Sequence, residues 1–293
     1  MARSSGFRSN SVHLQRYDNV DLQSLAKYSL PGSGDWPAGF LYLELKCDMR
    51  VPGQIVSQSR LANAAEIILV GAIAFVIVIV GWAFVGEDPF ARQAVVWVAN
   101  VLMLLTIWLG LRKRGQGWAH FGLSFRFGGG RALLRTVLQS VVVLVIALVA
   151  FAGGSVLASF RGTAPEPADM SSYSYLEGNL PMLLLSLAAV YVVSSFGEEV
   201  VYRGFLMNRL TEMTESSRAA WYASAVISAV VFGLAHFDWG FAGVVQTTMM
   251  GLALAVSYLL VKRNLWVLVL AHACIDTLLL IQLYQGPATA AAG

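Results

Sequence analysis

The chain has 293 residues, of which 57% are hydrophobic and 13% charged, and its mean hydropathy is +0.65. A soluble domain carries about 25% charged residues, so this composition argues against an ordinary soluble protein and indicates a membrane protein. The net charge is +3, and the Lys and Arg residues lie between hydrophobic blocks, which argues against nucleic-acid binding. Cys47 and Cys274 lack the spacing of a disulfide or zinc–thiolate framework.

Residues 1–60 contain no hydrophobic block and are rich in turn-forming residues, so we expect an N-terminal cytoplasmic extension. The alternating run from Phe40 to Lys46 predicts a short strand. The stretch Gly32-Ser33-Gly34-Asp35 is similar to the GxGD motif of aspartyl intramembrane proteases, but it lies outside any hydrophobic block, and we interpret it as a turn. No apolar region follows Arg3 and Arg8, so a cleavable signal peptide is not expected.

Seven hydrophobic blocks follow, and in lipid such blocks must be helices because exposed strand edges would leave backbone groups without hydrogen bonds. The predicted fold is therefore all-α, a polytopic transmembrane bundle of about seven helices, with an eighth left open. The blocks are Leu61 to Val85, Ala94 to Leu111, Val137 to Phe160, Leu180 to Phe196 continuing to Leu210, Ala219 to Ala235, Phe241 to Val261, and Leu265 to Leu283.

The blocks divide into two groups around a polar connection. We expect helices 1–3 in residues 61–176, together with an interfacial segment at Trp118 to Phe127. Residues 177–285 then form the membrane core that carries the chemistry, and 286–293 form a C-terminal tail.

Positive charges alternate between connections, which predicts a cytoplasmic N-terminus and an external C-terminus. The poorly basic connections instead carry Glu and Asp. The basic residues are Arg112, Lys113, Arg114, Arg126, Arg131 and Arg135 in the second connection, Arg203, Arg209 and Arg218 in the fourth, and Lys262 and Arg263 in the sixth.

Two adjacent glutamates and an arginine lie in the continuation of the fourth hydrophobic block. Glu199 and Arg203 are four residues apart on a helix and share a face, so they can form an ion pair, whereas Glu198 points about 100° away and is left for another partner. An ionised group within the bilayer is costly, so these residues are functional candidates. The plainer alternative is that both glutamates mark a cytoplasmic helix end.

Two further places join polar groups to hydrophobic helices. Phe232 and His236 lie one turn apart, although a single histidine there could simply be interfacial. His272 and Asp276 also lie one turn apart, and Asp276 could hold the imidazole in one tautomer. Simple alternation of helices puts Glu198 and His236 at different depths, so a shared site requires a long or tilted Leu180 to Leu210 helix or a turn from His236 toward Trp239.

Together, these side chains can hydrolyse an amide. A carboxylate and an imidazole that share a water molecule can deprotonate it, and a second histidine with a neighbour can donate hydrogen bonds to the developing oxyanion. The inventory is consistent with peptide-bond hydrolysis inside a membrane. The expected partners are the lipid bilayer and a membrane-associated peptide or protein, without nucleic acid.

The motifs Glu198-Glu199-x-x-x-Arg203, Phe232-x-x-x-His236 and His272-x-x-x-Asp276, in this order, resemble the CPBP family of CAAX proteases and bacteriocin-processing enzymes, which includes Rce1-type prenyl endopeptidases. The resemblance covers roughly Leu180 to Leu283. It implies a glutamic intramembrane protease without a cofactor, in which Glu198 and His236 activate water, Glu199 and Arg203 support them, and His272 with Asp276 serves the oxyanion.

The resemblance has one departure. Eukaryotic members carry asparagine where this chain has Asp276, and an ionised aspartate cannot donate to an oxyanion. Asp276 must then be protonated, orient His272, or change the activity. Aspartate occurs there in many prokaryotic members, so the departure bears on the mechanism more than on the resemblance. The expected location is a prokaryotic plasma membrane.

Other functions remain open from the sequence. A zinc ion held by Glu198, His236 and His272 would make the chain a metalloprotease, although HExxH is absent. A membrane scaffold or bacteriocin self-immunity protein could use the same groups to bind a peptide. A transporter could use the carboxylates as a proton relay.

Overall fold

The computed structural model describes residues 52–124, 129–160, 169–214 and 217–286, which belong to one unit of the chain that begins at Pro52. The strand expected from Phe40 to Lys46 and the turn expected from Gly32 to Asp35 lie outside these residues.

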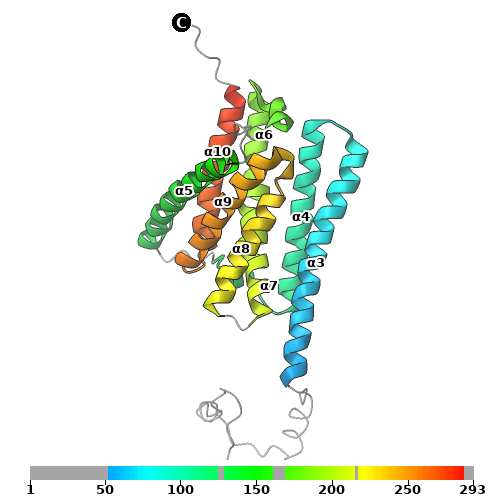
Figure 1. Ribbon diagram of the computed structural model, residues 1–293, viewed down its shortest axis with the longest axis vertical. Coiled ribbons are helices and arrows are strands. Elements are labelled where there is room, and N and C mark those ends of the chain that lie inside the picture. The colour runs from blue at the N-terminus through cyan, green and yellow to red at the C-terminus, as the bar shows by residue number, and fades with distance from the viewer. Residues whose placement is uncertain (1–51, 125–128, 161–168, 215–216, 287–293) are drawn as a thin grey trace, which may run out of the picture. The chain divides into compact units, whose positions relative to one another are not determined.

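The described residues contain helices and no strand, which confirms the predicted all-α membrane bundle (Figure 1). Within the described ranges, six helices are long and apolar enough to cross a membrane, and Arg218–Leu234 is a shorter apolar helix. The α-helices are α3 (Pro52–Val85), α4 (Pro89–Lys113), α5 (Gly130–Ser159), α6 (Leu180–Val190), α7 (Met207–Glu212), α8 (Arg218–Leu234), α9 (Gly240–Leu260) and α10 (Leu265–Gln285). Short helices are η1 (Trp118–Phe121), η2 (Ser171–Leu176), η3 (Tyr191–Phe196), η4 (Glu199–Leu206) and η5 (Phe237–Trp239).

Three helices begin at least five residues before their hydrophobic blocks. α3 starts at Pro52, where the block starts at Leu61, α4 at Pro89, where the block starts at Ala94, and α5 at Gly130, where the block starts at Val137. Hydropathy marks the residues that suit lipid, whereas a helix continues through polar residues such as Arg131 and Arg135 as long as its backbone bonds are kept.

Side-chain caps fix other boundaries. The Asp88 carboxylate accepts from the Ala91 backbone N–H at 2.6 Å, with Pro89 in the first turn of α4. Ser217 accepts from the Ala220 N–H at 3.1 Å in front of α8. Both are residue types that favour helix starts, because they satisfy N–H groups that lack a partner within the helix.

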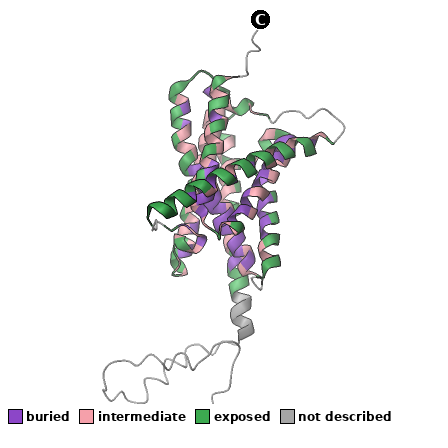
Figure 2. Ribbon diagram, turned by 90° about the vertical axis from the view of Figure 1, so that its left-hand side faces the viewer, coloured by how far each residue is buried: buried purple, intermediate pink, exposed green. Residues whose placement is uncertain are grey.

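α9 lies at the centre of the bundle and α3 at its margin. Half of the apolar window of the α9 span is buried inside the protein, against 6% of the α3 window. α5 crosses α9 obliquely, and α8 packs on another side of α9 (Figures 1 and 2). The outward faces are apolar, as expected where lipid is the solvent.

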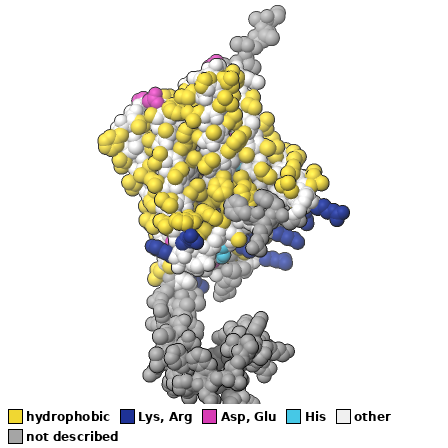
Figure 3. All heavy atoms as spheres, turned by 180° about the vertical axis from the view of Figure 1, so that it is seen from behind, with side chains coloured by type: hydrophobic (Ala, Val, Ile, Leu, Met, Phe, Trp, Pro, Cys, Tyr) yellow, Lys and Arg dark blue, Asp and Glu magenta, His cyan; other side chains and the backbone are white. Residues whose placement is uncertain are grey.

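The two ends of the bundle differ in charge. Hydrophobic side chains cover the middle band, Lys and Arg gather along one margin, and Asp and Glu appear at the other (Figure 3). The basic margin holds the end of α4 and the starts of α5 and α8, with Arg112, Arg131 and Arg218 exposed. This separation agrees with the alternation of charge along the sequence.

Two of the arginines assigned to the fourth connection do not lie in a loop. Arg203 and Arg209 are fully buried, because carboxylates inside the bundle compensate them. Arg209 donates to Glu66 and to Glu212, both at 2.8 Å, and Arg114 donates to the other oxygen of Glu66 at 2.8 Å. Only Arg218 of the three is an exposed positive charge.

The segment predicted to be interfacial contributes to the protein core. Phe121 and Leu123 are 0% and 1% exposed, and the Tyr258 hydroxyl donates to the Phe121 carbonyl oxygen at 3.0 Å. Gly122 has φ +83°, and a Cβ there would collide with the Arg263 carbonyl oxygen. The turn therefore packs against the α9–α10 connection, and protein covers Phe121 and Leu123. Phe125 and Phe127 of the predicted segment lie outside the described residues.

Candidate active site

The fourth membrane helix carries the carboxylates on an unusual winding. α6, η3, η4 and α7 follow one another as a single 33-residue span from Leu180 to Glu212, and both η3 and η4 are π-helical. π-Helical turns are rare and often occur at functional sites. Glu198 lies between the two π segments, and Glu199 opens the second.

Behind the site, the Glu199 carboxylate joins two helices. Its Oε1 accepts from Arg203 Nη1 at 2.7 Å, so the predicted ion pair is present, and from His272 Nδ1 on α10 at 2.8 Å. Arg203 also donates to the Gly251 carbonyl oxygen on α9 at 3.1 Å, and its guanidinium lies 4.6 Å from the centre of the Phe232 ring. Glu199 and Arg203 are both fully buried.

The other imidazole nitrogen of His272 faces two carboxylates. Its Nε2 lies 3.6 Å from Asp276 Oδ1 and 3.9 Å from Glu198 Oε2. The Ser195 hydroxyl donates to Asp276 Oδ2 at 2.6 Å. The close hydrogen bond that orients the imidazole is therefore the one that Glu199 accepts. The bond to Asp276 that the i, i+4 spacing allowed is not formed, because 3.6 Å is too long for such a bond.

His236 lies where α8 ends. Its Nδ1 is 2.8 Å from the Phe232 carbonyl oxygen, and its ring lies between those of Phe232 and Trp239, with both centroid distances 4.8 Å. The chain then turns through η5 to Trp239. A carbonyl oxygen only accepts, so Nδ1 carries the proton, and Nε2 is the acceptor of the neutral ring.

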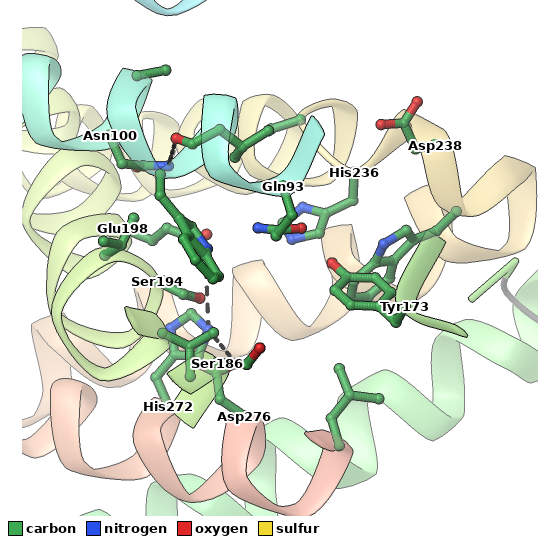
Figure 4. A pocket seen from close by; sticks show the side chains of 18 of the residues that line it. Gln93, Asn100, Tyr173, Ser186, Ser194, Glu198, His236, Asp238, His272 and Asp276 are labelled. Carbon is green, nitrogen blue, oxygen red and sulfur yellow. Dashed lines mark hydrogen bonds and ion pairs between the residues drawn. The ribbon is translucent and has the colours of Figure 1, made fainter. Parts of the chain in front are cut away.

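One cavity of about 650 Å³ brings these groups together. Glu198, His236, His272 and Asp276 all line it (Figure 4). A shared site required either a long fourth span or a turn from His236 to Trp239, and both are present. Glu199 and Arg203 lie behind the wall and do not line the cavity.

Several groups that contribute to the site could not be identified from a sequence motif. Ser195 is one serine in an apolar stretch, and the Gly251 carbonyl oxygen is a backbone atom 48 residues from Arg203. Tyr173, from η2, lines the cavity beside His236 (Figure 4). None of these has a motif, because only the packing of separate helices places them.

Within the described ranges, no group of three or more His, Cys, Asp and Glu side chains is arranged as metal ligands. Glu198, His236 and His272 share the cavity without forming such a group.

Comparison with known protein families finds a match over part of the chain. Residues 180–278 match the family described as type II CAAX prenyl endopeptidase Rce1-like. No curated protein and no solved structure matches the chain. The match spans α6 to α10 and contains all six side chains Glu198, Glu199, Arg203, His236, His272 and Asp276.

Proposed function

We propose a detailed mechanism for this chain on the premise that it belongs, through residues 180–278, to the Rce1-like family of CAAX endopeptidases. That membership makes it a membrane peptidase. The proposed reaction is hydrolysis of a peptide bond in a membrane-associated peptide or protein. The observation that carries the proposal is that Glu198, His236, His272 and Asp276 line a single cavity.

In this mechanism, Glu198 and His236 activate water. The His236 Nε2 accepts a hydrogen bond from the water, because its Nδ1–H is held by the Phe232 carbonyl oxygen. Glu198 has a buried Oε2 without a hydrogen-bond partner among the described residues, and it takes the proton as the water oxygen attacks the carbonyl carbon. The same proton then passes from Glu198 to the leaving amine nitrogen, which restores the carboxylate.

His272 stabilises the oxyanion of the tetrahedral intermediate. Glu199 accepts from His272 Nδ1–H and fixes the ring, so Nε2–H points toward the cavity wall formed by Glu198 and Asp276. Asp276 accepts a hydrogen bond from the Ser195 hydroxyl and lies beside His272 Nε2. From this position, its carboxylate can balance the positive charge of a doubly protonated His272. In this assignment, Asp276 supports the oxyanion donor and does not itself donate.

The substrate fits the membrane setting. The cavity is lined largely by apolar side chains of α3, α4 and α5, among them Phe75, Ile79 and Phe151. The family description names CAAX prenyl proteins, so a prenylated peptide is the first substrate class to test, with an unmodified leader-containing peptide as the second.

The test uses the purified full chain and quenched-fluorescent peptides, prenylated and plain, with and without EDTA. Glu198→Gln keeps the shape of the side chain and removes the base, so cleavage is expected to fall by about 10²- to 10⁴-fold. Glu177→Gln is the matched control, because Glu177 is exposed and lies outside the cavity. Cleavage is expected to continue in EDTA.

Three other results would each contradict a different part of the proposal. Loss of cleavage in EDTA would point to a metal held by Glu198, His236 and His272. Cleavage that survives Glu198→Gln would refute the assigned base. Peptide binding without cleavage by the wild type would favour a scaffold or self-immunity protein.

A further inference from the structure

A row of polar side chains on α4 faces the cavity from outside the matched region. Gln93, Trp97 and Asn100 follow the spacing i, i+4 and i+7, which places them on one face of the helix, and all three line the cavity. In Figure 4, Gln93 and Asn100 lie on the side opposite His272 and Asp276 of α10.

These groups are incompletely hydrogen-bonded. The buried Trp97 Nε1 has no hydrogen-bond partner among the residues that the structure describes. Asn100 is 7% exposed and uses one N–H of its amide to donate to the Val96 carbonyl oxygen at 3.1 Å, which leaves its second N–H. A buried donor without an acceptor costs free energy, and buried polar groups are nearly always paired.

The missing partner is a neutral acceptor. An indole N–H can only donate, so the partner of Trp97 must be an atom that accepts a hydrogen bond, such as an oxygen. No Lys or Arg is among the described residues that line the cavity, so this wall lacks the charge that would favour a carboxylate or phosphate. A peptide carbonyl oxygen has the required chemistry, whereas a hydrocarbon chain offers no acceptor.

We propose that Trp97 and Asn100 form a subsite that binds the peptide backbone of the substrate through its carbonyl oxygens, opposite the hydrolytic groups. The assignment rests on the proposed peptidase function and adds a substrate-binding wall on α4. The peptide lies between the α4 row and His272, and the apolar walls are left for the hydrophobic part of the substrate.

The experiment separates binding from cleavage. The full-length Glu198→Gln protein in detergent is titrated into an N-terminally fluorescent, S-farnesylated CAAX peptide, and binding is followed by fluorescence anisotropy. Adding Trp97→Phe, which keeps an aromatic ring beside Phe90 but removes the N–H, is expected to weaken binding by about three- to tenfold. Asn100→Leu is expected to act in the same direction.

The matched control is Trp108→Phe on the same helix. Trp108 packs against Arg112 and does not line the cavity, so binding is expected to stay unchanged. Competition by methyl farnesyl sulfide, which has the prenyl thioether but no carbonyl oxygen, is expected to be the same with and without Trp97→Phe.

Kinetics in the wild-type background complete the test. Trp97→Phe is expected to raise KM for the farnesylated peptide by a similar factor and to change kcat less than twofold. The subsite alone would be overturned if Trp97→Phe and Asn100→Leu both left the affinity for the peptide unchanged. It would also be overturned if they weakened binding of the peptide and of methyl farnesyl sulfide equally. A protein that neither cleaves nor binds the peptide would overturn the proposed function, and the subsite with it.

Discussion

At the scale of single residues, Glu199 links the parts of the site. One of its oxygens accepts from both Arg203 and His272, so a single carboxylate is shared by the fourth span and α10. Since it is fully buried, it depends on both donors for compensation. A change at either donor should therefore affect the stability of the protein and the position of His272.

We predict that Arg203→Met destabilises the protein by about 3–5 kcal/mol, because it leaves a buried carboxylate without its cation. A thermal unfolding scan in detergent should show an apparent Tm lower by roughly 6–20 °C. Arg92→Met is the control, since its partner Glu87 is 88% exposed and such surface pairs contribute only about 0–1 kcal/mol. Equal shifts for the two variants would contradict the structural role of the buried pair.

Local spacing predicted part of the site. The Glu199–Arg203 pair follows from a separation of four residues, and the Phe232–His236 ring contact follows in the same way. The His272–Glu199 bond joins residues 73 positions apart, and no local pattern contains it. For the same reason, the local spacing could suggest only Asp276 as the group that orients His272, whereas Glu199 forms that bond.

At the scale of helices, hydropathy located the apolar helices of the described residues, but it could not show how they are wound or how they pack. The π segments η3 and η4 are invisible to a hydropathy pattern, since the same apolar residues suit an α-helix. The burial of Phe121 also escaped it, because an aromatic residue between helices suits a lipid interface as well as a turn covered by protein.

The α5–α9 contact provides a test of the packing. A Cβ at Gly154 would lie 2.6 Å from the Gln246 Cα, whereas one at Gly153 would meet nothing within 4 Å. Small residues permit this close approach of helices in membranes. Gly154→Ala is expected to destabilise the protein by about 1–3 kcal/mol, as overpacking does.

Gly153→Ala is the neighbouring control, with an expected effect near zero or slightly stabilising, since alanine favours a helix by about 1 kcal/mol over glycine. Chemical denaturation followed by circular dichroism compares the two variants. If Gly154→Ala were as stable as Gly153→Ala, the close α5–α9 approach would be refuted.

At the scale of the whole molecule, the separation of charge predicts how the bundle lies in its membrane. The basic margin, with Arg112, Arg131 and Arg218, is expected to face the cytoplasm, and the end of α10 the outside. A fusion after residue 286 to alkaline phosphatase should be active in a bacterial host, and one to green fluorescent protein should be dark. The opposite pair of results would invert the orientation.

The length of the fourth span also sets a condition on the host bilayer. At about 1.5 Å per residue, 33 residues extend about 50 Å, well beyond a hydrocarbon layer of about 30 Å. A thin bilayer increases this mismatch and favours tilting, and tilt of the span shifts Glu198 relative to His272 on α10. Turnover in vesicles is therefore expected to be lower with 14-carbon than with 22-carbon phosphatidylcholine, so lipid chain length would act as a control on the enzyme, and equal rates in both would contradict this.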